Sequence, residues 1–169
     1  GDILFSSGRA GVPTKESQLY TIAVTGGMPE MLPVPRAYQG EISQDGKHVA
    51  YQPFGFWDPE WRNYRGGQAQ PIWITSLEDL STQFPPQLDR ERHVEPTWLD
   101  NKLYYLSERD YAMNVWMYDP ATKKEKQITF HKDFDCKTLD AGGGVLVYEQ
   151  GARLHLYDPE SESTTTPEI

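Results

Sequence analysis

The chain has 169 residues, with 16 Lys and Arg against 25 Asp and Glu, a formal net charge of −9, and one cysteine. A strongly acidic chain is a poor partner for nucleic acid or an anionic membrane, because both require clustered positive charge. No apolar stretch reaches the ~20 residues of a membrane span. The single cysteine, Cys136, excludes an internal disulfide and fits a reducing compartment.

The composition favours a single domain that is rich in β-strands. Ten Tyr, six Phe and five Trp are typical of strands, and 13 Pro with 14 Gly indicate many turns. The chain opens directly in a strand-like run and has no signal peptide, so we expect a fragment of a longer protein.

The first two predicted units share a strand–turn–strand pattern. Residues 1–36 hold strands at 3–7 and 18–22, with no strand before them. Residues 37–91 hold strands at 40–43, 48–52 and 71–75, and a long insertion at 53–70. The second unit is therefore the first complete one.

The same pattern recurs twice more. Residues 92–132 hold predicted strands at 96–99, 103–107, 114–118 and 126–129. Residues 133–169 hold predicted strands at 136–139, 145–149 and 153–157. Tight turns, such as Asp45-Gly46-Lys47 and Gly142-Gly143-Gly144, separate the first strand of a unit from the second.

This repeat predicts an all-β fold, a partial β-propeller. The equivalent strands at 18, 71, 114 and 153 begin 53, 43 and 39 residues apart, and propeller blades of four antiparallel strands repeat every ~40–50 residues. We expect about four blades, the first lacking its inner strand, and almost no helix. A β-sandwich is the alternative, but it does not call for four matching units in register.

The sequence offers no catalytic residues, metal ligands or cofactor site. It contains no Gly-x-Ser-x-Gly elbow, and its four histidines lack the spacing that places two imidazoles on one metal. Most serines fall at turns or strand ends, where hydroxyls usually bond to local backbone. Cys136 is expected to pack as a small buried side chain in an inner strand.

The insertion at 53–70 is the strongest candidate for a contact site. Arginine and aromatic residues are enriched at interaction hot spots, and the insertion supplies Trp57, Trp61, Arg62, Tyr64 and Arg65. The loop is predicted to dock another domain or subunit, or to bind a peptide whose carboxylate meets Arg62 or Arg65. Alternatively, it folds over its own blades and buries its aromatic rings.

Two histidines in equivalent connections between blades, His93 and His131, are further candidate contacts. Strand order places both connections on the same propeller face as the insertion, although solvated loops without a site remain the alternative. The inner strands are expected to line a polar central channel with Glu41, Ser43, Thr97, Lys137 and Thr138.

Several motifs resemble those of known propeller families. Ser-x-Asp-Gly-Lys-x-Val-Ala-Tyr at 43–51 is similar to TolB-like propellers. Asn63-Tyr64-Arg65-Gly66-Gly67, followed by Ile72-Trp73-Ile74, resembles the long blade insertion of tricorn-type serine proteases. Further resemblances in the same order occur at 6–9, 17–20, 105–110 and 147–151, and together they cover nearly the whole chain.

The tricorn resemblance implies the third to sixth blades of a six-bladed propeller near the N-terminus of a large, cytosolic, self-compartmentalising peptidase. In that family the propellers are thought to gate oligopeptides, while catalysis sits in a separate core. The resemblance therefore implies a non-catalytic domain whose partners are the remaining domains of the parent, peptides and further copies of the chain. A TolB-like interaction module unrelated to proteolysis, and a propeller hydrolase with its site on the loops, are the alternatives.

Overall fold

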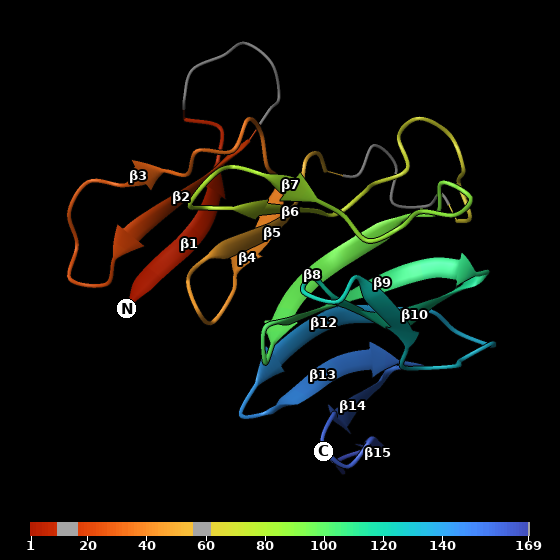
Figure 1. Cartoon of the computed structure of the whole chain (residues 1–169). Helices are drawn as coiled ribbons and strands as arrows, with labels where there is room; N and C mark the ends of the chain where they lie inside the picture. Colours follow the sequence, from red (N-terminus) through yellow and green to blue (C-terminus); the bar gives the residue numbers. More distant parts are fainter. Residues whose placement is uncertain (10–16, 56–61, 169) are drawn as a thin grey trace.

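The computed structural model describes residues 1–9, 17–55 and 62–168, and every helix or strand element in these ranges is a β-strand. The strands form four antiparallel sheets arranged one after another (Figure 1). The predicted all-β class and the partial propeller are confirmed. Within the described residues, no helix is long and apolar enough to cross a membrane.

The first two sheets follow the chain from the N-terminus. The first sheet has three strands, β1 (Asp2–Ser7), β2 (Gln18–Ala23) and β3 (Glu30–Met31). The second sheet has four, β4 (Gln39–Ile42), β5 (His48–Gln52), β6 (Trp73–Ser76) and β7 (Thr82–Gln83). The first sheet thus lacks the strand that corresponds to β4, as predicted.

The third and fourth sheets repeat the four-stranded pattern. The third contains β8 (His93–Leu99), β9 (Lys102–Asp110), β10 (Ala112–Asp119) and β11 (Lys124–Gln127). The fourth contains β12 (Cys136–Gly142), β13 (Val145–Gln150), β14 (Arg153–Asp158) and β15 (Ser163–Thr165). The inner strand β8 contacts both β4 and β12, so the first strands of the three complete sheets meet at a hub.

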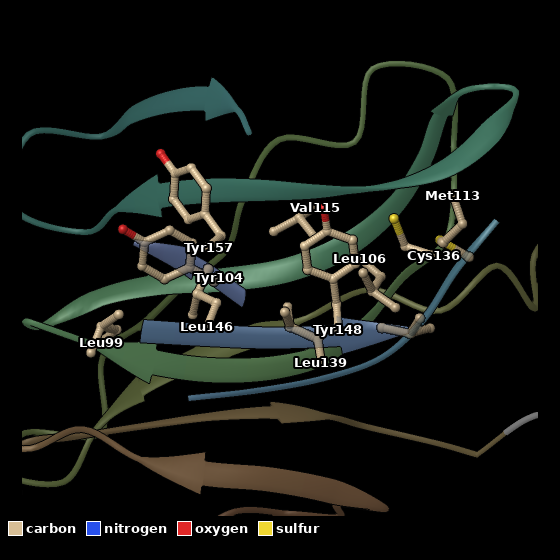
Figure 2. Close-up of a cluster of buried hydrophobic side chains, with 11 residues drawn as sticks. Leu99, Tyr104, Leu106, Met113, Val115, Cys136, Leu139, Leu146, Tyr148 and Tyr157 are labelled. Carbon is tan, nitrogen blue, oxygen red and sulfur yellow. The ribbon is translucent and has the colours of Figure 1, made fainter. Parts of the chain in front are cut away.

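Apolar side chains between neighbouring sheets hold the sheets together. Successive residues of a strand point to opposite faces, and in β5 both Val49 and Ala50 are fully buried, in the first and the second interface respectively. Figure 2 shows the third interface, where Leu106 and Val115 of the third sheet face Tyr148 of the fourth. Cys136 is buried in the same cluster, as predicted.

The chain reverses direction differently at the two ends of the sheets. The side that we call the turn face carries short turns at 24–29, 43–47, 77–81, 100–101, 120–123, 143–144 and 159–162. The opposite side, the loop face, carries the longer connections, which in the described residues cover 53–55, 62–72, 84–92 and 128–135 together with the residues that join β3 to β4. It also carries residues 8–9 after β1 and the short links at 111 and 151–152. In Figure 1 the turns β4–β5, β8–β9 and β12–β13 all lie on one side of the molecule.

The predicted tight reversals are confirmed, and their backbone explains the residues found there. Gly143 and Gly144 have φ values of 60° and 84°, and Asp100 and Asn101 have 51° and 55°. Two consecutive positive φ values match the twist of a two-residue hairpin, and Gly, Asn and Asp adopt them at the lowest cost.

Trp98 tests how strongly two adjacent sheets depend on one side chain. It is 1% exposed, and its Nε1–H donates to the Glu41 carbonyl of the neighbouring sheet at 3.0 Å. We predict that Trp98→Ala lowers the free energy of unfolding by about 4 kcal/mol, because it leaves a large cavity. Urea denaturation measures this. Leu88→Ala, at a side chain that is 74% exposed, is the control and should change it by less than about 0.5 kcal/mol.

Candidate functional site

The insertion between β5 and β6 is fastened to the third sheet through Glu108. Arg65 donates from Nη1 to Glu108 Oε1 and from Nη2 to the Glu108 carbonyl, both at 3.0 Å. The Asn63 N–H donates to Oε2 at 3.0 Å, and Arg92 Nε lies 3.3 Å from Oε1. The Glu108 side chain is only 4% exposed. A buried carboxylate needs positive charge or hydrogen-bond donors beside it, and two arginines and a backbone amide supply them here.

Arg62 joins the insertion to the connection between the third and fourth sheets. Its Nη2 donates to Asp135 Oδ1 at 2.8 Å, and the same oxygen accepts the Met113 N–H at 2.9 Å. The guanidinium lies over the Tyr111 ring, 5.6 Å from its centre, yet the side chain is 52% exposed. Arg62 is therefore oriented but still accessible.

Of the three aromatic candidates in the insertion, the structure describes Tyr64. Tyr64 is half-buried, and its ring lies so close to Gly66 that any side chain at position 66 would overlap it. A larger residue at position 66 would therefore have to displace the Tyr64 ring. Trp57 and Trp61 lie outside the described residues.

The prediction that His93 lies in a surface connection is wrong. His93 is the first residue of β8 and is 0% exposed, because β8 begins before Pro96 and continues through a bulge at Glu95, which has a φ of 53°. Its ring packs on Tyr105, with centroids 4.8 Å apart. Burial lowers the His93 pKa, against the opposing influence of Glu91. A side chain so enclosed cannot touch a surface partner.

Beside His93, Glu91 is the centre of a second buried ionic group. Its carboxylate accepts the N–H groups of Leu88 and Asp89 at 3.1 and 2.8 Å, and Arg109 Nε at 2.8 Å. Burial by itself would raise the Glu91 pKa, but the neighbouring His93 ring and hydrogen bonds from the backbone and Arg109 outweigh it and hold the pKa well below its usual range. Glu91 therefore stays charged and fixes the connection between the second and third sheets.

His131 lies on the loop face, as predicted, but it is half-buried. Its Nε2 is 3.2 Å from the Tyr148 hydroxyl, and its ring centre is 5.8 Å from that of His155. Burial, followed by the neighbouring His155, lowers its pKa. His131 thus packs between the third and fourth sheets and leaves only part of its ring accessible.

A hollow of about 600 Å³ opens at the hub, where the inner strands meet. Its polar lining comes from β4, β8 and β12: Gln39, Glu41, Glu95, Thr97, Thr138 and Asp140. Both β8 and β12 bulge at this level, and each bulge contains a residue with positive φ that lines the hollow. Glu41, Thr97 and Thr138 are therefore where the sequence places them.

The other two predicted channel residues lie elsewhere. Ser43 is buried at the turn face, where its hydroxyl donates to Asp45 at 2.6 Å. Lys137 borders a groove of about 480 Å³ on the loop face, together with Arg62, Asp133, Phe134, Asp135 and Glu149. The bulge in β12 places Thr138, and not Lys137, in the hollow.

The hub hollow is electronegative. Burial raises the pKa of Glu41, the neighbouring Thr97 and the hydrogen bond from the Trp98 N–H lower it, and the charge of Asp140 raises it further. Glu41 belongs to the second sheet and Asp140 to the fourth, so carboxylates from non-adjacent sheets influence each other across the hub. Among the described residues, no group of three or more His, Cys, Asp or Glu could hold a metal ion.

Sequence reasoning missed Glu91, Glu108 and Arg109. Each carries a charge at or near a strand end, which usually indicates a solvated position, yet Glu91 and Glu108 are buried. The only available signal was the crowding of arginines at 62, 65, 90, 92 and 109, which require nearby carboxylates when they are buried.

Comparison with known proteins gives one family and several related structures. Residues 1–163 match the model of the tricorn protease N-terminal beta propeller domain. A tricorn protease homolog of Saccharolobus solfataricus is 27% identical over 155 residues, which cover 90% of this chain and 14% of that protein. The chain thus spans about one seventh of that relative's length.

Two solved structures share the fold. The crystal structure of the tricorn protease superposes with a TM-score of 0.60 at 15% identity, covering 99% of this chain and 21% of that one. A putative TolB from Agrobacterium tumefaciens has a TM-score of 0.73 at 18% identity, covering 98% and 60%. At these identities the structures establish the propeller architecture alone.

The buried carboxylate of Glu108 is expected to contribute to the stability of the fold. We predict that Glu108→Gln lowers the free energy of unfolding by about 3 kcal/mol, because Arg65 and Arg92 then lack their buried counter-charge. Chemical denaturation at neutral pH measures the change. Glu160→Gln, at an exposed turn position, is the charge-matched control. Equal effects of the two substitutions would show that Glu108 does not fasten the insertion.

The charge of Glu91 makes the stability of the fold depend on pH. The Glu91 pKa is lowered in the folded state, so its contribution to stability is complete above its ordinary value of 4.5 and declines as the pH falls below it. We expect the destabilisation caused by Glu91→Gln to be larger at about pH 7 than at about pH 3. Denaturation of both proteins across this range measures the difference, and a pH-independent difference would contradict the assignment.

Proposed function

Since the chain belongs to the family of tricorn protease N-terminal β-propeller domains, we propose that it is a non-catalytic domain of a longer serine peptidase that degrades oligopeptides. Its proposed role is to gate peptides through the hub and to support the remaining domains. The parent is proposed to be cytoplasmic and to assemble from several copies. The match of residues 1–163 to the family model carries this proposal.

The hub hollow supports a gating role. It lies at the inner strands, the position of the central channel in a propeller, and its lining mixes carboxylates, an amide and hydroxyls with apolar side chains such as Leu139, Val147 and Leu154. Such a lining offers exchangeable hydrogen bonds to any peptide backbone without binding one side chain tightly. The carboxylates favour peptides with a free ammonium group or basic side chains over acidic ones.

The proposed absence of catalysis by this chain rests on the environment of its histidines. In the described parts of the chain, no serine hydroxyl hydrogen-bonds to an imidazole, whereas a nucleophilic serine needs a base within that reach. His48 and His93 pack against the rings of Trp98 and Tyr105. The chemistry is therefore assigned to another part of the longer polypeptide.

The proposed contact residues are the candidates that stay accessible on the loop face, Arg62, Tyr64, Arg65 and His131. Arg62 is the most suitable of them for a carboxylate, because one of its guanidinium nitrogens is held by Asp135 while half of the side chain faces solvent. Arg65 is more enclosed and is occupied by Glu108.

The alternative is an interaction module like that of TolB. The higher TM-score of the TolB structure favours it as a description of shape, but the sequence match is to the tricorn family model. The polypeptide that contains this chain distinguishes the two, because only the first proposal requires a serine peptidase core.

Narrowing the hub tests the proposed gate. We predict that Asp140→Trp in the full-length polypeptide lowers turnover of peptides of about ten residues several-fold, because the indole occupies the hollow, and leaves a single-residue chromogenic substrate unaffected. Peptide hydrolysis followed by mass spectrometry measures both rates. The control is Glu160→Trp, on an exposed turn away from the hub.

Two outcomes would contradict the proposal. Equal effects of Asp140→Trp on both substrates would remove the hub from the peptide route. Hydrolysis by this 169-residue chain alone, retained through repurification, would contradict the non-catalytic assignment.

A further inference from the structure

Arginine and lysine are distributed unequally over the two faces of the molecule, although Lys132 and Lys137 share the loop face with the arginines. All eight arginines lie in loop-face connections or at the strand ends that border them: Arg9, Arg36, Arg62, Arg65, Arg90, Arg92, Arg109 and Arg153. Of the eight lysines, five lie at or beside turn-face reversals: Lys47, Lys102, Lys123, Lys124 and Lys126. The family match does not account for this separation.

The exposed aromatic rings follow the arginines. Tyr38, Phe84, Tyr111, Phe130 and Phe134 are the exposed aromatic side chains among the described residues, and all five lie on the loop face. The exposed large apolar side chains of turn-face reversals are aliphatic: Val24, Met28 and Leu80. The two faces thus differ in aromatic as well as in basic residues.

This combination distinguishes a contact surface from a solvated one. Aromatic residues and arginine are enriched at protein interfaces, where lysine is depleted. An ammonium group is strongly hydrated, whereas a guanidinium group loses water more easily and stacks on rings. Arg62 over Tyr111 shows such stacking, and the adjoining groove exposes the Phe134 ring.

Two exposed arginines of the loop face have no ion-pair partner within the described residues. Arg90 and Arg153 are exposed, and no ion pair holds either of them in the described parts of the chain. In a chain with a net charge of −9, these groups favour a partner that presents carboxylates or backbone carbonyls.

We propose that the loop face docks another folded domain of the same polypeptide, one whose surface places carboxylates among apolar side chains. This rests on the proposed function only in requiring a longer polypeptide, and the matched relative has about six sevenths of its length outside the aligned region. The exposed rings are spread over the connections of all four sheets. A broad folded surface fits that spread better than a single extended peptide does.

Hydrogen exchange in the full-length polypeptide tests the docking face. The variant Phe84→Ser/Tyr111→Ser/Phe134→Ser should raise exchange about tenfold in loop-face segments 84–92 and 128–135, since their amides lose the cover of the partner domain. The matched control, Val24→Ser/Met28→Ser/Leu80→Ser on the turn face, should leave those segments unchanged. Exchange in the buried strands β9 and β10 reports whether the propeller stays folded.

Each outcome decides the proposal. A rise confined to the turn-face variant, or no rise with either variant, would overturn it. Protection of the same segments in the isolated chain by added oligopeptides would assign the face to peptides, and protection that grows with chain concentration would assign it to a second copy. Loss of peptide hydrolysis is scored separately, so failure of the proposed function does not decide the docking face.

Discussion

The middle strands of the second and third sheets are buried on both faces, and the rest of the structure depends on this. Val49 and Ala50, adjacent in β5, are both inaccessible to solvent but face different neighbouring sheets. A sheet with two apolar faces cannot end at solvent on either side, so the second and third sheets each require a neighbour on both sides. Stacking of twisted sheets around the inner strands follows, and it creates the hub and the two dissimilar faces.

The turn face and the loop face differ in the length of their connections and in the residues they carry. The turn face consists of short reversals whose geometry is largely set by the hairpins. The residues there are therefore those that can adopt the backbone conformation of a turn. The loop face has longer connections that geometry constrains less, and there arginine, aromatic rings and buried carboxylates accumulate. The buried carboxylates of Glu91 and Glu108 hold these connections in place through hydrogen bonds. Rigid connections bind with less loss of entropy than mobile ones, which suits a surface that holds another domain.

The hub presents a different chemistry from the loop face. Its lining comes from strands, and the bulges at Glu95 and Thr138 bring successive blades into the same arrangement. Carboxylates from the second and fourth sheets influence each other there, whereas the loop face carries the arginines. One propeller fragment thus separates a hollow lined by carboxylates from a face that carries its arginines and exposed aromatic rings.

The sequence alone determined the architecture, because the strand repeat, the turn residues and the alternation of apolar side chains are local properties of the chain. It also identified Glu41, Thr97 and Thr138 as hub residues. It could not determine which charges are buried. The sequence predicts a loop position for His93, because it does not reveal the bulge that extends β8. It predicts a solvated position for Glu108, because the partner Arg65 is 43 residues away in the chain. Such partners are distant in sequence, so only the tertiary structure decides whether a charged side chain faces water or another charge.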